Sequence, residues 1–213
     1  MIVNLEKDAG LELTRRSETL HVLPRPAASS RMLVERFIED RFLDRFGSVV
    51  SEHYPILLSL QNEAGAVLAT LGLRGAAEES LFLEHYFDDP IERVIWQALG
   101  VRPARADILE IGSLASVGRG ASARLVAATA LYLASCPYRY AVVTATEELR
   151  RMLGSFDFAW RALGPARADR LPDFGRSWGH YYEQAPMILM GEIRQGSKRV
   201  QPLAQRIRIQ IHR

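Results

Sequence analysis

The chain has 213 residues, of which 48% are hydrophobic and 24% charged, and this balance excludes wholesale disorder. Its single cysteine, Cys136, excludes an internal disulfide and favours a reducing compartment. The N-terminus lacks a basic region followed by an apolar core, and the longest apolar run, 125–136, falls short of the about 20 residues of a membrane span. We therefore expect a cytoplasmic globular protein.

Apolar periodicity and turn residues divide the chain into alternating strands and helices. Pro90 and Gly100 mark the start and the end of one helix, and a glycine-containing loop between two apolar segments predicts a hairpin. The predicted elements, in chain order, are a strand at 19–23, a helix ending at 46, a hairpin of 54–60 and 66–73, a short strand or turn at 81–86, a helix at 90–100, a strand around Glu110, a helix at 120–135, a strand at 140–146, a short helix at 147–153, an irregular segment at 155–177 and a strand at 187–193.

This order predicts a single α/β domain over 1–193, built on a mixed sheet flanked by helices on both faces. Residues 194–213 form a basic tail, which carries six basic residues and no acid although the whole chain has a net charge of only +2. Such a tail suits an anionic membrane surface or an acidic partner, or is simply solvated. Its end alternates with period two, which predicts an edge strand that pairs across a homodimer.

The strand around Glu110 carries the strongest chemical signal. A lone carboxylate in an apolar strand is costly to bury, so Glu110 is expected to face a cavity or a partner, with a pairing arginine such as Arg74 or Arg105 as the structural alternative. A glycine turn and a helix N-terminus follow, and this arrangement often holds phosphate. An acid and a phosphate-binding turn therefore lie within one short segment.

Several standard sites are absent from the sequence, including the Gly-x-Ser-x-Gly elbow, His-Glu-x-x-His, paired Cys-x-x-Cys and the phosphate-binding P-loop pattern. The acids and histidine of 84–92 are interpreted as helix caps rather than metal ligands, so no metal site is expected. Residues 118–123 match the dinucleotide pattern Gly-x-Gly-x-x-Ala, but the next acid, Glu147, comes 27 residues after Gly120 instead of about 20. An NAD(P)-binding oxidoreductase is therefore only an alternative.

The same turn is also suited to the phosphate of coenzyme A or of a carrier protein's phosphopantetheine arm, with charge added by Arg119 or Arg124. Glu110 would then orient or deprotonate an amine that attacks the thioester. Coenzyme A or phosphopantetheine would be a co-substrate, and no permanently bound cofactor is expected.

Five short pieces, in this order, resemble the bacterial thermostable hemolysin family, and the resemblance extends over about residues 30–193. That family is similar to GNAT-type acyltransferases and to acyl-homoserine-lactone synthases. Ser113 stands where the synthases tend to carry an arginine, and the GNAT pyrophosphate pattern is not cleanly present around Arg119, which favours a carrier-protein thioester over coenzyme A. The pieces are Leu81-Phe-Leu-Glu84, Pro90-Ile-Glu92, Glu110-Ile-Gly-Ser-Leu-Ala115, Thr144-Ala-Thr146 and Trp178-Gly-His-Tyr-Tyr182.

The resemblance implies a GNAT-like acyltransferase that moves a fatty acyl group from a carrier-protein or coenzyme A thioester to the amine of a small amino-acid-like acceptor. In this interpretation Glu110 is catalytic. The residues implied in substrate binding are Arg74 (for an acceptor carboxylate), Glu84, Thr144, Trp178 and Tyr181; those for the pantetheine arm are Leu114, Ala115 and Ser116; and those for its phosphate are Gly118, Arg119, Gly120 and Ala121.

Four arginines, Arg119, Arg124, Arg150 and Arg151, are candidates for a docking surface for an acidic carrier protein. No nucleic-acid partner is expected. The family's name suggests a second class of function, a membrane-active protein without enzymatic activity, and a third alternative is a binding module without turnover. The sequence has neither a spanning helix nor an amphipathic repeat that would favour direct pore formation.

Overall fold

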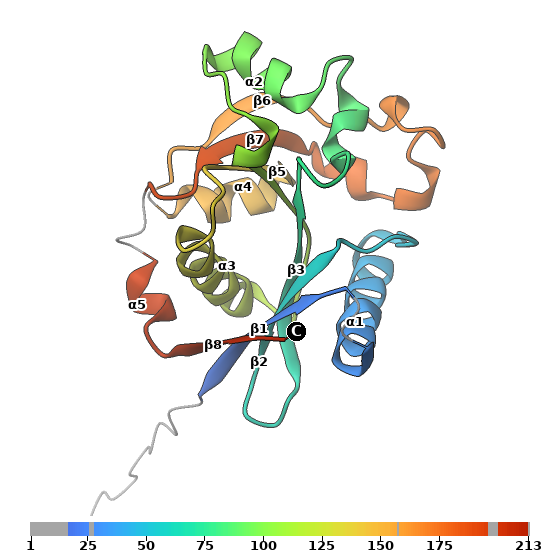
Figure 1. Ribbon diagram of the computed structural model, residues 1–213. Coiled ribbons are helices and arrows are strands. Elements are labelled where there is room, and N and C mark those ends of the chain that lie inside the picture. Colours follow the sequence, from blue (N-terminus) through green and yellow to red (C-terminus); the bar gives the residue numbers. More distant parts are fainter. Residues whose placement is uncertain (1–16, 26–27, 157, 196–199, 213) are drawn as a thin grey trace, which may run out of the picture.

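The computed structural model describes residues 17–25, 28–156, 158–195 and 200–212, which build one mixed sheet with helices on both faces (Figure 1). The sheet has eight strands in the order β6-β7-β5-β4-β3-β2-β1-β8, which confirms the predicted fold class. The strands are β1 Glu18–Pro24, β2 Ile56–Gln61, β3 Val67–Gly75, β4 Ile108–Ser116, β5 Tyr140–Ala145, β6 Arg161–Pro165, β7 Met187–Glu192 and β8 Ile207–Ile211.

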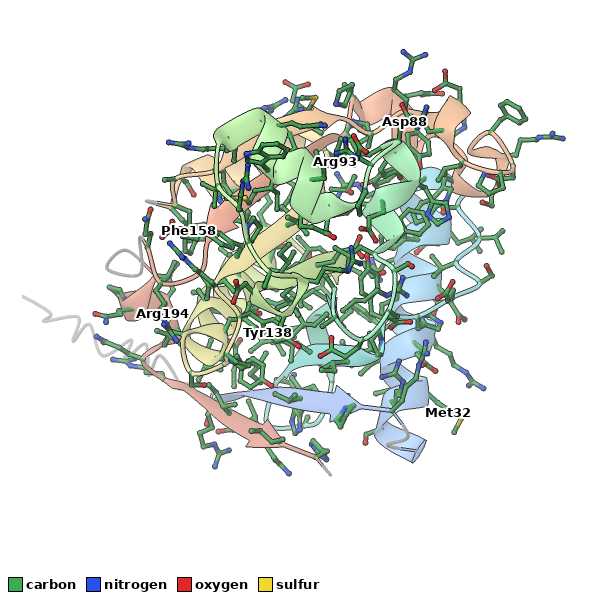
Figure 2. The ribbon with its side chains drawn as sticks, turned by 45° about the horizontal axis from the view of Figure 1, so that its top comes forward. Met32, Asp88, Arg93, Tyr138, Phe158 and Arg194 are labelled. Atoms are coloured by element: carbon green, nitrogen blue, oxygen red, sulfur yellow. The ribbon has the colours of Figure 1, made fainter. Side chains whose placement is uncertain are left out.

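The helices cover the two faces of this sheet unequally (Figure 1). Buried side chains of α1 and α2 contact one face, whereas α3 and α5 pack together against the other and α4 joins them beside β5 and β7. Figure 2 shows the outer side chains, and Met32 on the outward side of α1 is 56% exposed. The helices are α1 Ala28–Phe46, α2 Ile91–Leu99, α3 Arg119–Ala134, α4 Glu147–Gly154 and α5 Gln201–Ala204, with the 3₁₀ helix η1 Phe82–Tyr86 before α2.

Among the described strands, only β4–β5 and β1–β8 are parallel, and the other neighbours are antiparallel. The predicted hairpin is β2–β3. The dinucleotide alternative does not fit this arrangement, because the Rossmann fold has an open, mostly parallel sheet. The single β4–α3–β5 crossover places the glycine turn at the carboxyl end of β4.

The structure corrects the prediction for one segment and decides between two predicted alternatives for another. The irregular segment 155–177 contains β6, an edge strand that pairs with β7 across a register shift between Ala162 and Gly164. A strand that contains glycine and ends in Pro165 has weak sequence signals, and the edge position tolerates both residues. Residues 82–86, predicted as a strand or a turn, form the 3₁₀ helix η1.

β4 and β5 separate beyond the middle of the sheet. Their parallel pairing ends at Ile111↔Val143, although β4 continues along β3 to Ser116 and β5 continues along β7 to Ala145. Opposite β3, β4 contains a bulge between Gly112 and Ala115, and Ser113 takes the left-handed backbone conformation with φ of 50°. A bulge bends its strand and increases the local twist. The result is a split between two central strands, directly before the glycine turn.

The C-terminal residues 207–211 add β8 to the edge of the sheet, parallel to β1. Lys198, Arg199 and Arg213 of the predicted basic tail lie outside the described residues. Within the described part of the chain, no helix combines the length and the apolar character needed to cross a membrane.

Candidate active site

Glu110 lies on β4 with only 1% of its surface exposed. Its carboxylate accepts hydrogen bonds from the backbone N–H groups of Phe82, at 2.8 Å, and Leu83, at 3.0 Å. These N–H groups are free to donate because the first turn of a helix has no preceding carbonyl to bind them. Helix η1 therefore holds the acid predicted from the sequence in a fixed orientation.

Burial raises the pKa of Glu110 to about 7, an effect that the N–H groups of Phe82 and Leu83, the charge of Arg74 and the hydroxyl of Tyr54 only partly offset. Both protonation states of Glu110 are therefore populated near neutral pH. A group with such a pKa is well suited to accept and return a proton, because transfer is most effective when the pKa is close to the working pH. This is the property expected of a general base.

Tyr54 packs against the sheet beside Glu110 and was not singled out by the sequence. It fits because Gly72 and Gly112 form a cross-strand pair beneath it: a Cβ at Gly112 would lie 2.1 Å from the Tyr54 hydroxyl, and one at Gly72 would lie 2.5 Å from the Tyr54 Cβ. Burial, followed by the charge of Glu110, raises the pKa of Tyr54, so the phenol stays protonated. Two glycines inside strands were the sequence signal for this close approach.

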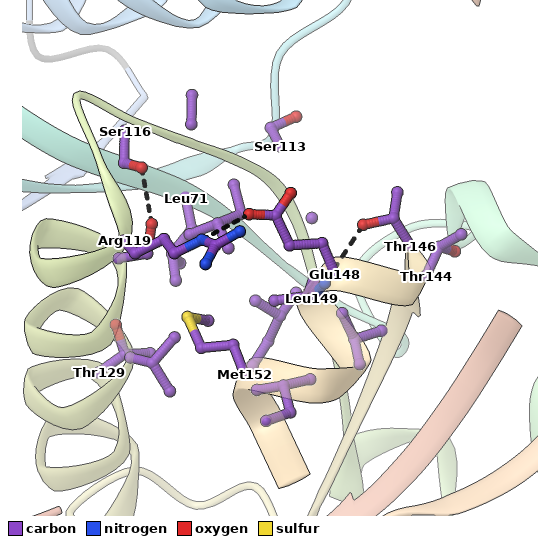
Figure 3. Close-up of a pocket in the computed structure, with 18 of the residues that line it drawn as sticks. Leu71, Ser113, Ser116, Arg119, Thr129, Thr144, Thr146, Glu148, Leu149 and Met152 are labelled. Carbon is purple, nitrogen blue, oxygen red and sulfur yellow. Dashed lines mark hydrogen bonds and ion pairs between the residues drawn. The ribbon is translucent and has the colours of Figure 1, made fainter. Parts of the chain in front are cut away.

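A cavity of about 800 Å³ passes through the split between β4 and β5, with lining residues from both faces of the sheet (Figure 3). Exposed charged side chains surround its mouth, and its interior is mainly apolar. The charged residues of the mouth are Arg41, Asp44, Arg45, Arg119, Glu148 and Arg151, and one more acid, Glu192 of β7, also lines the cavity. The apolar residues of the interior include Ile111, Leu114, Val126, Leu133, Val143, Met152, Leu153, Phe158 and Trp160.

The match to protein families extends over residues 25–197, and the matching model is described as thermostable hemolysin. The chain belongs to the thermostable hemolysin family. No curated protein matches the chain.

Solved structures share the fold of this family member. The acyl-homoserine-lactone synthase LasI superposes with a TM-score of 0.60 at 14% identity, over 87% of this chain and 94% of LasI. FeeM, an N-acyl amino acid synthase from uncultured soil microbes, gives a TM-score of 0.58 at 12% identity, over 90% of this chain and 96% of FeeM. The coenzyme A-dependent acyl-homoserine-lactone synthase BjaI gives 0.60 at 15% identity, over 92% of this chain and 95% of BjaI. At these identities the likeness shows the fold, which is that of GNAT-like acyltransferases.

In this thermostable hemolysin family member, most of the residues predicted for the pantetheine arm and its phosphate line the cavity. They are Leu114 within the bulge, Ala115 and Ser116 after it, and then Gly118 and Arg119. Gly118 is the N-cap of α3, which begins at Arg119. Gly120 and Ala121 belong to the first turn of α3, but neither lines the cavity.

The predicted substrate-binding residues divide into two groups. Thr144 and Tyr181 line the cavity, whereas Trp178 stands behind Tyr181, with their rings 5.4 Å apart between centroids. Trp178 is also 5.4 Å from the ring of Phe82, whose N–H binds Glu110. The aromatic side chains of this segment therefore connect the cavity wall to the turn that holds the acid.

Glu110, Arg74 and Glu84 do not line the cavity, so the expectation that Glu110 faces it is not met; the next two residues of β4, Ile111 and Gly112, are the ones that line it. Arg74 is 6% exposed and pairs with Glu52 at 3.0 Å and Glu79 at 3.4 Å, so its guanidinium is already engaged. Its charge favours the ionised form of Glu110, but the structural alternative of an ion pair between the two is not formed among the described contacts.

Glu84 accepts hydrogen bonds from the N–H groups of Leu81 and Ile91, at 2.8 and 2.9 Å, and from Arg105, at 2.7 Å. Burial raises the pKa of Glu84, but these bonds outweigh it, so the net pKa is lowered. Glu84 and Arg105 thus form a structural node between η1 and α2. Among the described residues, no group of three or more side chains is arranged to hold a metal ion.

The four predicted docking arginines do not share one surface. Arg119 and Arg151 lie at the cavity mouth, but Arg124 binds Glu18 through two hydrogen bonds of 2.8 and 2.9 Å, and Arg150 donates to the carbonyl of Ala185. The mouth instead receives two arginines from α1, Arg41 and Arg45. The sequence reasoning missed both, because they belong to an amphipathic helix in which exposed arginines carry no distinctive signal.

Proposed function

We propose that this protein is an N-acyltransferase that moves a fatty acyl group from a phosphopantetheine thioester to the amine of a small amino-acid-like acceptor. The observation that carries the proposal is the position of Glu110, with a pKa raised to about 7, one residue before the split between β4 and β5; its neighbours Ile111 and Gly112 line the cavity with the apolar interior. The structural neighbours include acyl-homoserine-lactone and N-acyl amino acid synthases, which supports the same reaction class.

The split gives the thioester its route into the protein. Beyond Ile111, β4 has no ladder partner on the β5 side among the described residues, so its backbone is available to an extended pantetheine arm. In this proposal the arm lies along Leu114–Ser116, its phosphate lies near Gly118 and Arg119, and the acyl chain enters the apolar interior. Burial of about 0.8 kcal/mol per methylene would favour a long chain.

The chemistry then requires one base and one set of hydrogen-bond donors. Glu110 takes a proton from the acceptor amine, with the Tyr54 hydroxyl between the buried carboxylate and the strand at Gly112. The amine nitrogen bonds to the thioester carbonyl carbon, and the oxyanion that forms accepts hydrogen bonds from backbone N–H groups of β4. Collapse of this tetrahedral intermediate breaks the C–S bond, and the departing thiolate takes up the proton that Glu110 returns.

The acceptor carboxylate needs a cation that is not already paired. Arg74 was the sequence candidate, but Glu52 and Glu79 engage it. Arg41 lines the cavity, as Tyr181 does, and it takes this role in the proposal. An arginine is suited to the task because its planar fork matches a carboxylate.

The test is release of free thiol and formation of acyl amide by the purified full chain. Acyl-carrier-protein and coenzyme A thioesters of several chain lengths are offered with a panel of amino acids and related amines. We expect amide formation with at least one combination of thioester and amine. If no combination yields an amide, the proposal is wrong. Dye release from liposomes by the protein without an acyl donor would support the membrane-active alternative instead.

A further inference from the structure

Glu148, in the first turn of α4, joins three helices at the mouth of the cavity. Its carboxylate accepts hydrogen bonds from Arg45 of α1 and from Arg119 at the start of α3, the latter at 3.2 Å between Nε and Oε1. All three side chains line the cavity. Figure 3 shows Arg119 and Glu148 reaching toward each other across the pocket from α3 and α4.

Stability does not account for this arrangement. The side chains of Glu148, Arg45 and Arg119 are 37%, 54% and 86% exposed, and ion pairs at such positions contribute little to folding. The hydrogen bond from Arg45, joined by Arg119, lowers the pKa of Glu148 despite partial burial, so this carboxylate is charged at neutral pH. Two guanidinium groups at the entrance of a cavity are thus occupied by an anion that belongs to the protein itself.

We propose that Glu148 is a specificity-determining residue that competes with the phosphate of the donor for Arg45 and Arg119. This inference rests on the proposed function, in which the donor phosphate lies beside Gly118 and Arg119. The donor phosphate, a phosphodiester with one negative charge in a carrier protein and a pyrophosphate with two in coenzyme A, offers several oxygens to the arginine fork, and in this proposal it displaces Glu148. A pantetheine thioester without phosphate cannot displace Glu148, so the ion pairs of Glu148 with Arg45 and Arg119, which connect α1, α3 and α4, stay in place.

The nearby charges are consistent with this competition. The mouth contributes four arginines, Arg41, Arg45, Arg119 and Arg151, against Asp44 and Glu148, and the cavity lining holds one more acid, Glu192. Arg151 is held by Glu147 at 2.8 Å within α4. Removing Glu148 therefore releases two arginines for an incoming anion and changes no other acid at the mouth.

The test compares Glu148→Gln with Glu147→Gln in the full-length protein. Glu147 is the matched control, because it lies next to Glu148 on α4, loses the same charge and does not line the cavity. Titration calorimetry measures binding of pantetheine, 4′-phosphopantetheine, coenzyme A and a phosphopantetheinylated carrier protein. We expect Glu148→Gln to tighten the phosphorylated ligands by about twofold to tenfold, to leave pantetheine unchanged, and to exceed the effect of Glu147→Gln.

Two further measurements sharpen the result. In a protein that also carries Arg119→Gln, the gain from Glu148→Gln should shrink, because one of the contested arginines is gone. Coenzyme A and the carrier protein share the phosphate chemistry, and the larger gain between them identifies the donor class that uses the mouth.

The sign of the effect decides the proposal. Weaker binding of phosphorylated ligands by Glu148→Gln would mean that Glu148 only positions the arginines, and equal gains with pantetheine would mean a steric effect; either result overturns it. An unchanged affinity alongside intact acyl transfer would remove this inference and leave the proposed function standing. Absence of both binding and transfer would remove the two together.

Discussion

The two faces of β4 present opposite environments within consecutive residues. On one face, η1 holds the carboxylate of Glu110 by hydrogen bonds and Tyr54 packs closely over Gly112, which also borders the cavity. On the other face, Ile111 contributes to a cavity of about 800 Å³ with an apolar lining. Tight packing on one face thus fixes the orientation of the Glu110 carboxylate, whereas the other face leaves room for a ligand. The two environments adjoin at the split between β4 and β5.

The largest expected effect is the loss of the base. Glu110→Gln should lower kcat/KM by about a hundredfold to ten-thousandfold, because the amine loses its proton acceptor. With a pKa of about 7, wild-type kcat/KM should rise with pH and level off above 7, whereas the variant should show no such rise. A variant that keeps the wild-type profile would remove Glu110 from the mechanism.

The next effect tests the opposite face of β4. Met152→Trp fills part of the cavity from α4 and should lower kcat/KM for the longest accepted acyl chain by about tenfold while sparing short chains. Met152→Ala, which enlarges the same space, is the control and should shift the preference toward longer chains. Equal losses for all chain lengths would place the acyl chain elsewhere.

A smaller effect is expected from removal of the Tyr54 hydroxyl. Tyr54→Phe keeps the ring that fits over Gly72 and Gly112 but removes the hydroxyl, which favours the ionised form of Glu110. The midpoint of the pH profile should move upward by about one unit, with a several-fold loss of kcat/KM at pH 7. An unshifted midpoint would show that the hydroxyl does not act on Glu110.

The last comparison concerns the free energy of unfolding, to which Glu84 and Glu110 should contribute with opposite sign. Glu84→Gln should lower the free energy of unfolding by about 2 kcal/mol at all pH values where Glu84 is charged, because it weakens the bonds from Arg105, Leu81 and Ile91. Chemical denaturation of the purified variant measures this loss, and an unchanged midpoint would contradict the structural node.

Glu110 should behave in the opposite way. Its folded-state pKa of about 7 lies above its usual 4.5, so the unfolded state ionises first as the pH rises, and stability is lost between about pH 4.5 and 7 and levels off above 7. Between pH 5 and pH 8, Glu110→Gln should gain on the order of 2 kcal/mol relative to wild type. A constant difference across that range would show that the pKa is not raised.

The sequence identified Glu110 because a single acid in an apolar strand is a local contrast, and the strand itself supplies the burial. The order of elements likewise predicted the mixed sheet. Arg74 and Glu84 were harder to assign, because the role of a charge depends on its partners, and Glu52 and Arg105 are distant in sequence. Nothing in the local pattern of either residue indicates which partner it meets.

The cavity could not be predicted, because it depends on where two strands stop pairing. Its lining comes from β3, β4, β5, β7, three helices and the segment at Phe158 and Trp160, and no single segment contains its signature. Arg45 illustrates the difficulty, since only the packing of α1 brings it to Glu148. The glycine turn was predictable as a helix start, but its neighbours at the mouth were not.

The parallel pairing of β8 with β1 has a consequence for how the protein is made. His21 and His212 lie 2.9 Å apart between ring nitrogens although 191 positions separate them in the chain. Contacts of such long sequence separation form late, since the intervening chain must first be ordered. On the ribosome, β1 therefore keeps an open edge until the last strand emerges, and a chain cut before Ile207 would expose an edge that can pair with other chains.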